Sequence, residues 1–103
     1  RSGGENIYPA ELEMVLKDHS AVADLAIIGV PDVKYEETVC AVIVVKDGAF
    51  IDPEEFRAYA RTRLAKYKVP THIEIVDELP RTASGKIQKF VLRERYLHLE
   101  NNH

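Results

Sequence analysis

The stretch Thr38-Val39-Cys40-Ala41-Val42-Ile43-Val44-Val45 decides the fold of this 103-residue chain. It is a nearly continuous run of β-branched and small apolar residues, and it stops at the turn sequence Lys46-Asp47-Gly48. A strand that is apolar on both faces must be covered on both faces. We therefore expect a buried central strand over residues 38–45, with other elements packed on each side of its sheet.

Two further strands are expected beside this one. Val22 to Val30 is rich in branched apolar residues and ends at Pro31. Because the connection to the strand at 38–45 is short, the two strands are expected to be antiparallel neighbours. Ile73 to Val76 forms a third, short strand after a helix, and a strand-helix-strand order predicts a right-handed crossover and parallel pairing.

Three helices complete the order. The first is expected over Ala10 to Lys17, after Pro9 in the first turn. The second begins at Asp52-Pro53-Glu54-Glu55, which combines an N-cap carboxylate, a proline and a glutamate three residues after the cap. Its buried stripe is predicted to comprise Phe56, Tyr59, Ala60, Arg63 and Leu64, with Arg63 extending to solvent from the edge of the stripe.

The third helix is expected from about Ile87 to about Leu97, since Ile87, Phe90 and Val91 have helical spacing. The predicted order is helix, strand, strand, helix, strand, helix. This is an α/β (α+β) fold, with a small mixed three-stranded sheet and helices on both faces. Residues 1–103 are expected to form a single domain.

Composition excludes several function classes. The net charge of −3 disfavours binding to nucleic acid. The fractions of hydrophobic residues (46%) and charged residues (30%) are typical of a globular protein. No apolar run approaches a membrane span, and the first residues lack a signal pattern, so we expect a soluble cytoplasmic domain. Cys40 is predicted to be a buried inert thiol, and no metal site is expected because the four histidines lack ligand spacing.

The segment from Glu78 to Lys89 is predicted to be a polar loop with a defined backbone conformation. Its predicted supporting residues are a proline, two short hydroxyls and a glycine with conformational freedom: Pro80, Thr82, Ser84 and Gly85. They lead into Lys86, which the expected helix start at about Ile87 would place near the first turn of that helix. A cation is unfavourable at that end of a helix, so the pattern suggests an anionic partner supplied from outside.

Three interpretations of this loop compete. It can be a solvated turn. It fails as a phosphate-binding P-loop, because that motif needs glycine where Pro80 stands and a hydroxyl where Ile87 stands. Third, Pro80-Arg81-Thr82-Ala83-Ser84-Gly85-Lys86-Ile87-Gln88-Lys89 resembles the C-terminal signature loop of adenylate-forming enzymes, the acyl-CoA synthetase and ligase superfamily.

Other motifs resemble the same C-terminal domain, in the same order along the chain. They are Ser2-Gly3-Gly4-Glu5-Asn6-Ile7-Tyr8-Pro9-Ala10-Glu11-Leu12-Glu13, Gly29-Val30-Pro31-Asp32, and Leu64-Ala65-Lys66-Tyr67-Lys68-Val69-Pro70. The first is closer to acyl-CoA ligases than to peptide-synthetase modules or luciferases. Tyr35-Glu36-Glu37 departs from the family pattern, in which a glycine often replaces the middle residue.

The resemblance implies a two-step reaction. A carboxylate and ATP give an acyl-adenylate and pyrophosphate, and the thiol of CoA then displaces AMP, while the domain rotates between the steps. Lys86 is implied as the catalytic lysine of the first step. Gly3, Gly4 and Glu5 would line the thiol path of the second, and Lys66 and Lys68 would meet the nucleotide end of CoA. Mg²⁺ is expected in the N-terminal adenylation domain.

The resemblance also implies that this chain lacks the adenylation domain and is inactive alone. That domain of the same polypeptide would be its partner, and the carboxylic acid, ATP and CoA its substrates. The alternative is a stand-alone interaction or regulatory module acting in trans on an adenylating enzyme. The basic residues Arg61, Arg63, Lys66 and Lys68 can equally be a solvated face.

Overall fold

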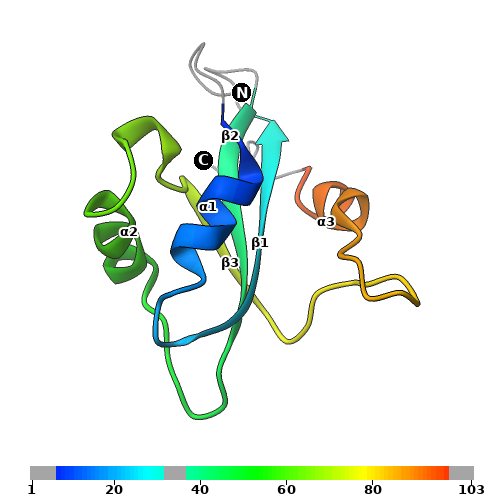
Figure 1. Ribbon diagram of the computed structural model, residues 1–103. Helices are drawn as coiled ribbons and strands as arrows, with labels where there is room; N and C mark the ends of the chain where they lie inside the picture. The colour runs from blue at the N-terminus through cyan, green and yellow to red at the C-terminus, as the bar shows by residue number, and fades with distance from the viewer. Residues whose placement is uncertain (1–6, 32–36, 98–103) are drawn as a thin grey trace.

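The computed structural model describes residues 7–31 and 37–97 of the chain. The predictions on Gly3, Gly4 and Glu5, and the family departure at Tyr35 and Glu36, lie outside the described residues. The helices and strands, labelled in Figure 1, are α1 (Pro9–Leu16), β1 (Val22–Pro31), β2 (Glu37–Val45), α2 (Pro53–Arg61), β3 (His72–Val76) and α3 (Lys89–Arg95). A 3₁₀ turn (Lys66–Lys68) lies between α2 and β3 in the chain. The predicted order of helices and strands is confirmed.

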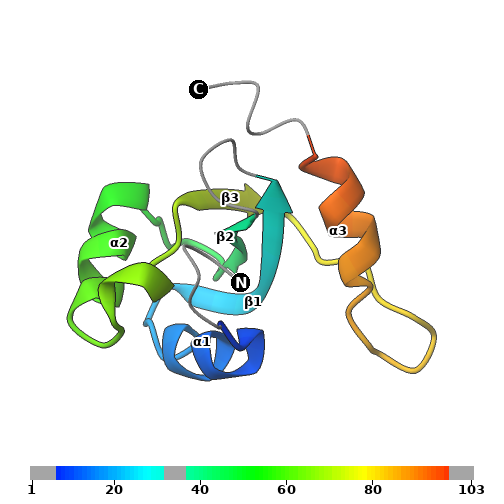
Figure 2. The ribbon, with the colours of Figure 1, turned by 90° about the horizontal axis from the view of Figure 1, so that it is seen from above.

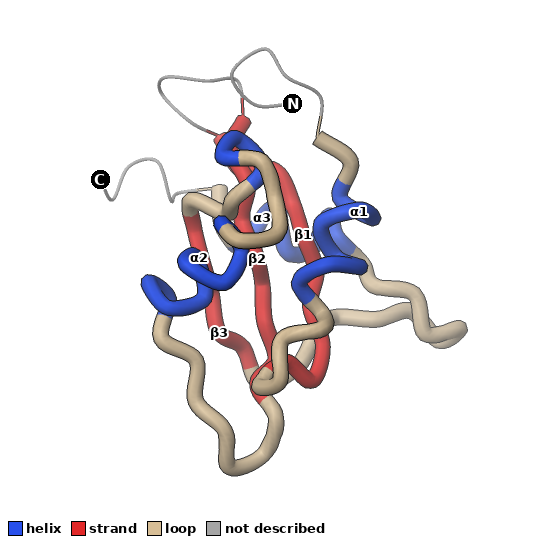
Figure 3. Tube along the Cα trace, turned by 60° about the vertical axis from the view of Figure 1, so that its left-hand side comes forward, coloured by secondary structure: helices blue, strands red, loops and turns tan. Residues whose placement is uncertain are grey.

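The sheet has the order β1-β2-β3, with β1 and β2 antiparallel and β2 and β3 parallel. Both predicted pairings are therefore correct. In the central strand, Ala41 is opposite Ile27 on one side and Ile73 on the other. Figure 3 shows β2 lying between the two other strands.

Both faces of the sheet are covered, as the continuous apolar run predicted. Val39, Ala41 and Ile43 of β2 pack with α1 and α2, through residues such as Leu12 and Phe56. The alternate residues of the same strand face α3 on the other side. Figure 2 shows α1 and α2 on one side of the sheet and α3 on the opposite side.

The second helix starts where its sequence indicates but ends early. The Asp52 carboxylate accepts a hydrogen bond from the Glu55 amide at 3.0 Å, which confirms the predicted N-cap. The helix ends at Arg61, and Leu64 lies beyond it. Arg63 is exposed, and its guanidinium lies 3.8 Å from the centre of the Tyr59 ring, which agrees with a side chain that extends to solvent from the edge of the apolar stripe.

The start and the buried face of the third helix differ from the prediction. Ile87 pairs with Arg81 in a β-bridge, and the helix begins at Lys89. Phe90, placed on the apolar stripe by its spacing, is 61% exposed. Leu92 and Tyr96 are the buried residues of this segment, and they pack against the second face of the sheet.

Cys40 is fully buried in that second core, as predicted. Burial, with a smaller contribution from the charge of Glu74, raises the pKa of its thiol to about 12. Over the described ranges, no helix combines the length and apolar character that crossing a membrane requires.

Candidate functional site

Residues 80–88 form a hairpin that presents Lys86. Its two arms are joined by hydrogen bonds from the Thr82 amide to the Lys86 carbonyl (2.8 Å) and from the Gln88 amide to the Pro80 carbonyl (2.9 Å). The Gly85 amide donates to the Thr82 carbonyl at 2.9 Å and closes the turn. Lys86 therefore lies in the second arm of a hairpin, two residues before the Gln88 N-cap of α3. The predicted helix start at about Ile87, which would place Lys86 near a first turn, is wrong, and the dipole argument for an anion no longer applies.

The supporting residues of the hairpin act through hydrogen bonds and backbone conformation. The Lys86 amide donates to Thr82 Oγ1 at 3.1 Å, and that oxygen lies 3.0 Å from Ser84 Oγ. Gly85 has φ +90°, a conformation that L side chains rarely adopt. A Cβ added there would have no heavy atom within 4 Å. The positive φ of Gly85 therefore accounts for a glycine at this point.

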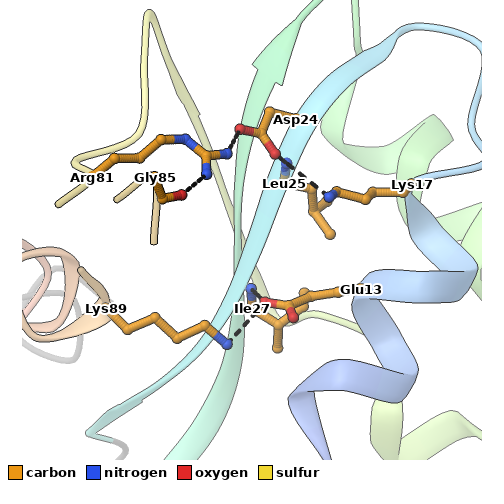
Figure 4. A network of polar contacts seen from close by, with 8 residues as sticks. All are labelled: Glu13, Lys17, Asp24, Leu25, Ile27, Arg81, Gly85 and Lys89. Atoms are coloured by element: carbon orange, nitrogen blue, oxygen red, sulfur yellow. Dashed lines mark hydrogen bonds and ion pairs between the residues drawn. The ribbon is translucent and has the colours of Figure 1, made fainter. Parts of the chain in front are cut away.

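A salt bridge fastens the hairpin to the start of β1. Arg81 donates one hydrogen bond to the Gly85 carbonyl at 2.6 Å and another to the carboxylate of Asp24, as Figure 4 shows. The same carboxylate accepts from the Leu25 amide at 2.9 Å and lies 3.7 Å from Lys17 Nζ. Burial alone would raise the pKa of Asp24, but Arg81, the Leu25 amide and Lys17 together hold it below its usual value.

A second ion pair fixes the segment that follows the hairpin. Lys89, the first residue of α3, lies 2.8 Å from Glu13 Oε2 of α1. The same carboxylate oxygen accepts from the Ile27 amide of β1 at 2.9 Å. The hairpin is thus fixed near both of its ends, to the sheet through Asp24 and to α1 through Glu13 (Figure 4).

Lys86 itself is exposed, and its charge is not neutralised locally. Within residues 7–31 and 37–97 its ammonium group has no hydrogen-bond or ion-pair partner. By contrast, Lys17, Lys68 and Lys89 each lie within ion-pair distance of a carboxylate. A rigid hairpin therefore presents one cation whose charge is available to an external anion.

The other basic candidates lie elsewhere on the molecule. Lys68 Nζ is 2.7 Å from Glu11 Oε1, and this hydrogen bond raises the pKa of Lys68. Lys66 lines a pocket of about 270 Å³ with Arg57 and Arg61. Figures 1 and 2 place the 3₁₀ turn that carries Lys66 and Lys68 across the sheet from the hairpin. The structure does not bring these two lysines together with Lys86.

Four residues that hold the hairpin have no role predicted from the sequence. They are Glu13, Asp24, Arg81 and Lys89. One signal was present, because Asp24 is a charged residue within an otherwise apolar strand, and such a residue needs a partner. Its partner Arg81 is 57 residues away in the sequence.

Comparison with known proteins identifies the chain. Residues 11–86 match the AMP-binding enzyme C-terminal domain, and the chain belongs to this family, the C-terminal domain of adenylate-forming acyl-CoA synthetases and ligases. It is 46% identical over 99 residues to the putative acyl-CoA synthetase YngI of Bacillus subtilis (strain 168), a match that covers 96% of this chain and 18% of that protein. It is 53% identical over 95 residues to a feruloyl-CoA synthase of an Amycolatopsis species, covering 92% of this chain and 19% of that one.

The fold agrees with the same assignment. The crystal structure of ATP-bound MatB from Rhodopseudomonas palustris matches with a TM-score of 0.92 and 40% identity, over 96% of this chain and 20% of that chain. The chain thus spans about a fifth of the length of these relatives.

Proposed function

We propose that residues 1–103 are the C-terminal domain of an ATP-dependent acyl-CoA synthetase. In the first half-reaction a carboxylate oxygen attacks the α-phosphorus of ATP, the bond to pyrophosphate breaks, and an acyl-adenylate forms. In the second the thiolate of CoA attacks the acyl carbon and AMP leaves. The names of the relatives and the ATP bound to MatB support this reaction, and the small share of each relative that is matched supports an adenylation domain as the partner.

Lys86 supplies positive charge to the first half-reaction. Negative charge gathers around the α-phosphate as the carboxylate approaches, and a positioned ammonium offsets it without moving a proton. The observation that carries this role is the state of Lys86: exposed, held on a hydrogen-bonded hairpin, and without a carboxylate partner in the described residues. Removing one such stabilising group commonly lowers a rate by roughly 10²- to 10³-fold.

The second half-reaction uses other parts of the chain. Gly3, Gly4 and Glu5 are assigned to the thiol path, and Lys66 and Lys68 to the nucleotide end of CoA. The 3₁₀ turn that carries Lys66 and Lys68 lies across the sheet from the hairpin that carries Lys86, which supports the use of different faces in the two steps. Mg²⁺ is assigned to the adenylation domain, as expected from the family resemblance.

The test is Lys86→Ala in the complete enzyme, with the two half-reactions measured separately. Pyrophosphate release should fall by roughly 10²- to 10³-fold, whereas thioester formation from supplied acyl-adenylate should be largely retained. Lys46→Ala is the matched control, since Lys46 is also exposed but lies at the end of β2. Equal loss of both half-reactions would contradict the role of Lys86.

A further inference from the structure

Arg81 holds the peptide group that joins Gly85 to Lys86. The Gly85 carbonyl accepts from Arg81 at 2.6 Å, and the Lys86 amide of the same peptide donates to Thr82 Oγ1 at 3.1 Å. A peptide group is planar, so binding both of its polar atoms fixes the direction in which the next Cα lies. The backbone from which the Lys86 side chain extends is therefore set by Arg81 and Thr82.

Asp24 connects this arrangement to the sheet. The pairing of β1 with β2 shifts register between Val22 and Asp24, and an irregularity of this kind changes the direction of a nearby side chain. The Asp24 side chain is 22% exposed, and one of its oxygens accepts from the Leu25 amide. Its other oxygen accepts from Arg81. A rigid strand is thus linked through Asp24 and Arg81 to the peptide that precedes Lys86.

We infer that Asp24 and Arg81 are positioning residues for Lys86 in adenylate formation. This inference rests on the proposed function. Without the Asp24 carboxylate, Arg81 keeps its charge but loses its attachment to β1, and the hairpin can shift relative to the sheet. A displacement of about 1 Å at a reacting centre can cost roughly 10²-fold in rate. Because thioester formation does not use Lys86, the loss belongs to the first half-reaction alone.

The test uses the complete enzyme with Asp24→Asn or Arg81→Lys, each made alone and together with Lys86→Ala. Either single variant should lower kcat for adenylate formation by roughly 10- to 100-fold and leave KM for ATP and the thioester step little changed. Lysine lacks the planar fork that lets arginine bind two acceptors, so charge at position 81 is not sufficient. Asp24→Glu keeps the carboxylate and should restore most of the rate.

The decisive comparison is made in the absence of the lysine side chain. If Asp24 acts through Lys86, Asp24→Asn causes no further loss in the Lys86→Ala enzyme, whereas a second independent role would give additive losses. Glu55→Gln, which removes an exposed carboxylate from α2 across the sheet, is the control and should leave the rate unchanged.

Three results would overturn the inference: an unchanged rate of adenylate formation in the single variants, equal slowing of both half-reactions, or additive losses with Lys86→Ala. If Asp24→Asn does not fold, Arg81→Lys decides by the same criteria. The proposed function fails separately, if Lys86→Ala alone leaves adenylate formation intact.

Discussion

Replacing Gly85 by alanine should destabilise the hairpin through backbone conformation alone. The residue has φ +90°, and an added Cβ would have no heavy atom within 4 Å, so no clash contributes. Holding an L residue at positive φ costs about 1–2 kcal/mol. In a domain of this size, each 1 kcal/mol lowers the midpoint of thermal unfolding by roughly 4–8 °C.

Gly48 provides a matched control for this substitution. It has φ +77°, and an added Cβ there also meets no heavy atom within 4 Å. Gly48→Ala should therefore lower the unfolding midpoint by a similar amount, measured by circular dichroism on each purified chain. In the complete enzyme, however, we expect only Gly85→Ala to slow pyrophosphate release, because Gly85 directly precedes Lys86 and Gly48 follows β2.

The two variants together separate stability from function. If Gly85→Ala left both the midpoint and the rate of pyrophosphate release unchanged, the positive φ would not be required for the hairpin. If both variants slowed the reaction equally, the loss would follow from lower stability and not from the position of Lys86.

Two further predictions concern titratable groups. Burial opposes ionisation of Asp24, but Arg81, the Leu25 amide and Lys17 together hold its pKa below the usual value of an aspartate. The stabilising contribution of the carboxylate is therefore fully present above the unfolded-state pKa and is lost as the pH falls through the folded-state pKa. Urea titrations between about pH 6 and about pH 2 give the free energy of unfolding of the unchanged chain and of Asp24→Asn. The difference between the two free energies should shrink as the pH falls, and a constant difference would contradict the prediction. Burial raises the pKa of the Cys40 thiol to about 12, so Cys40 should react with iodoacetamide only as the chain unfolds. Labelling is followed by mass spectrometry, and rapid labelling of the folded chain would refute the prediction.

The topology was predictable from local patterns in the sequence. The apolar run of β2 required cover on both faces, and the short connection to β1 required an antiparallel pair. The N-cap at Asp52 was equally local, because its partner Glu55 is three residues away. Each of these features is determined by residues that are close together in the sequence, so the pattern of the sequence was sufficient to predict it.

The start of α3 could not be obtained in the same way. Ile87, Phe90 and Val91 have helical spacing, but the backbone around Ile87 is used by the hairpin, where the Gln88 amide donates to the Pro80 carbonyl. Spacing does not show which hydrogen bonds a segment makes. The link between Asp24 and Arg81 was hidden for another reason, since it joins residues far apart in sequence that the fold brings together.

The contact of Glu13 with Ile27 has a consequence for association between molecules. In the described sheet β1 is paired with β2 alone, and the other edge of such a strand can template pairing with a strand of a second chain. Glu13 occupies a position at this edge by accepting from the Ile27 amide, and Lys89 adds a second charge beside it. Because charged side chains at an edge strand disfavour pairing with a second chain, the ion pair of Glu13 and Lys89 that holds α3 should also protect the edge strand β1 from aggregation.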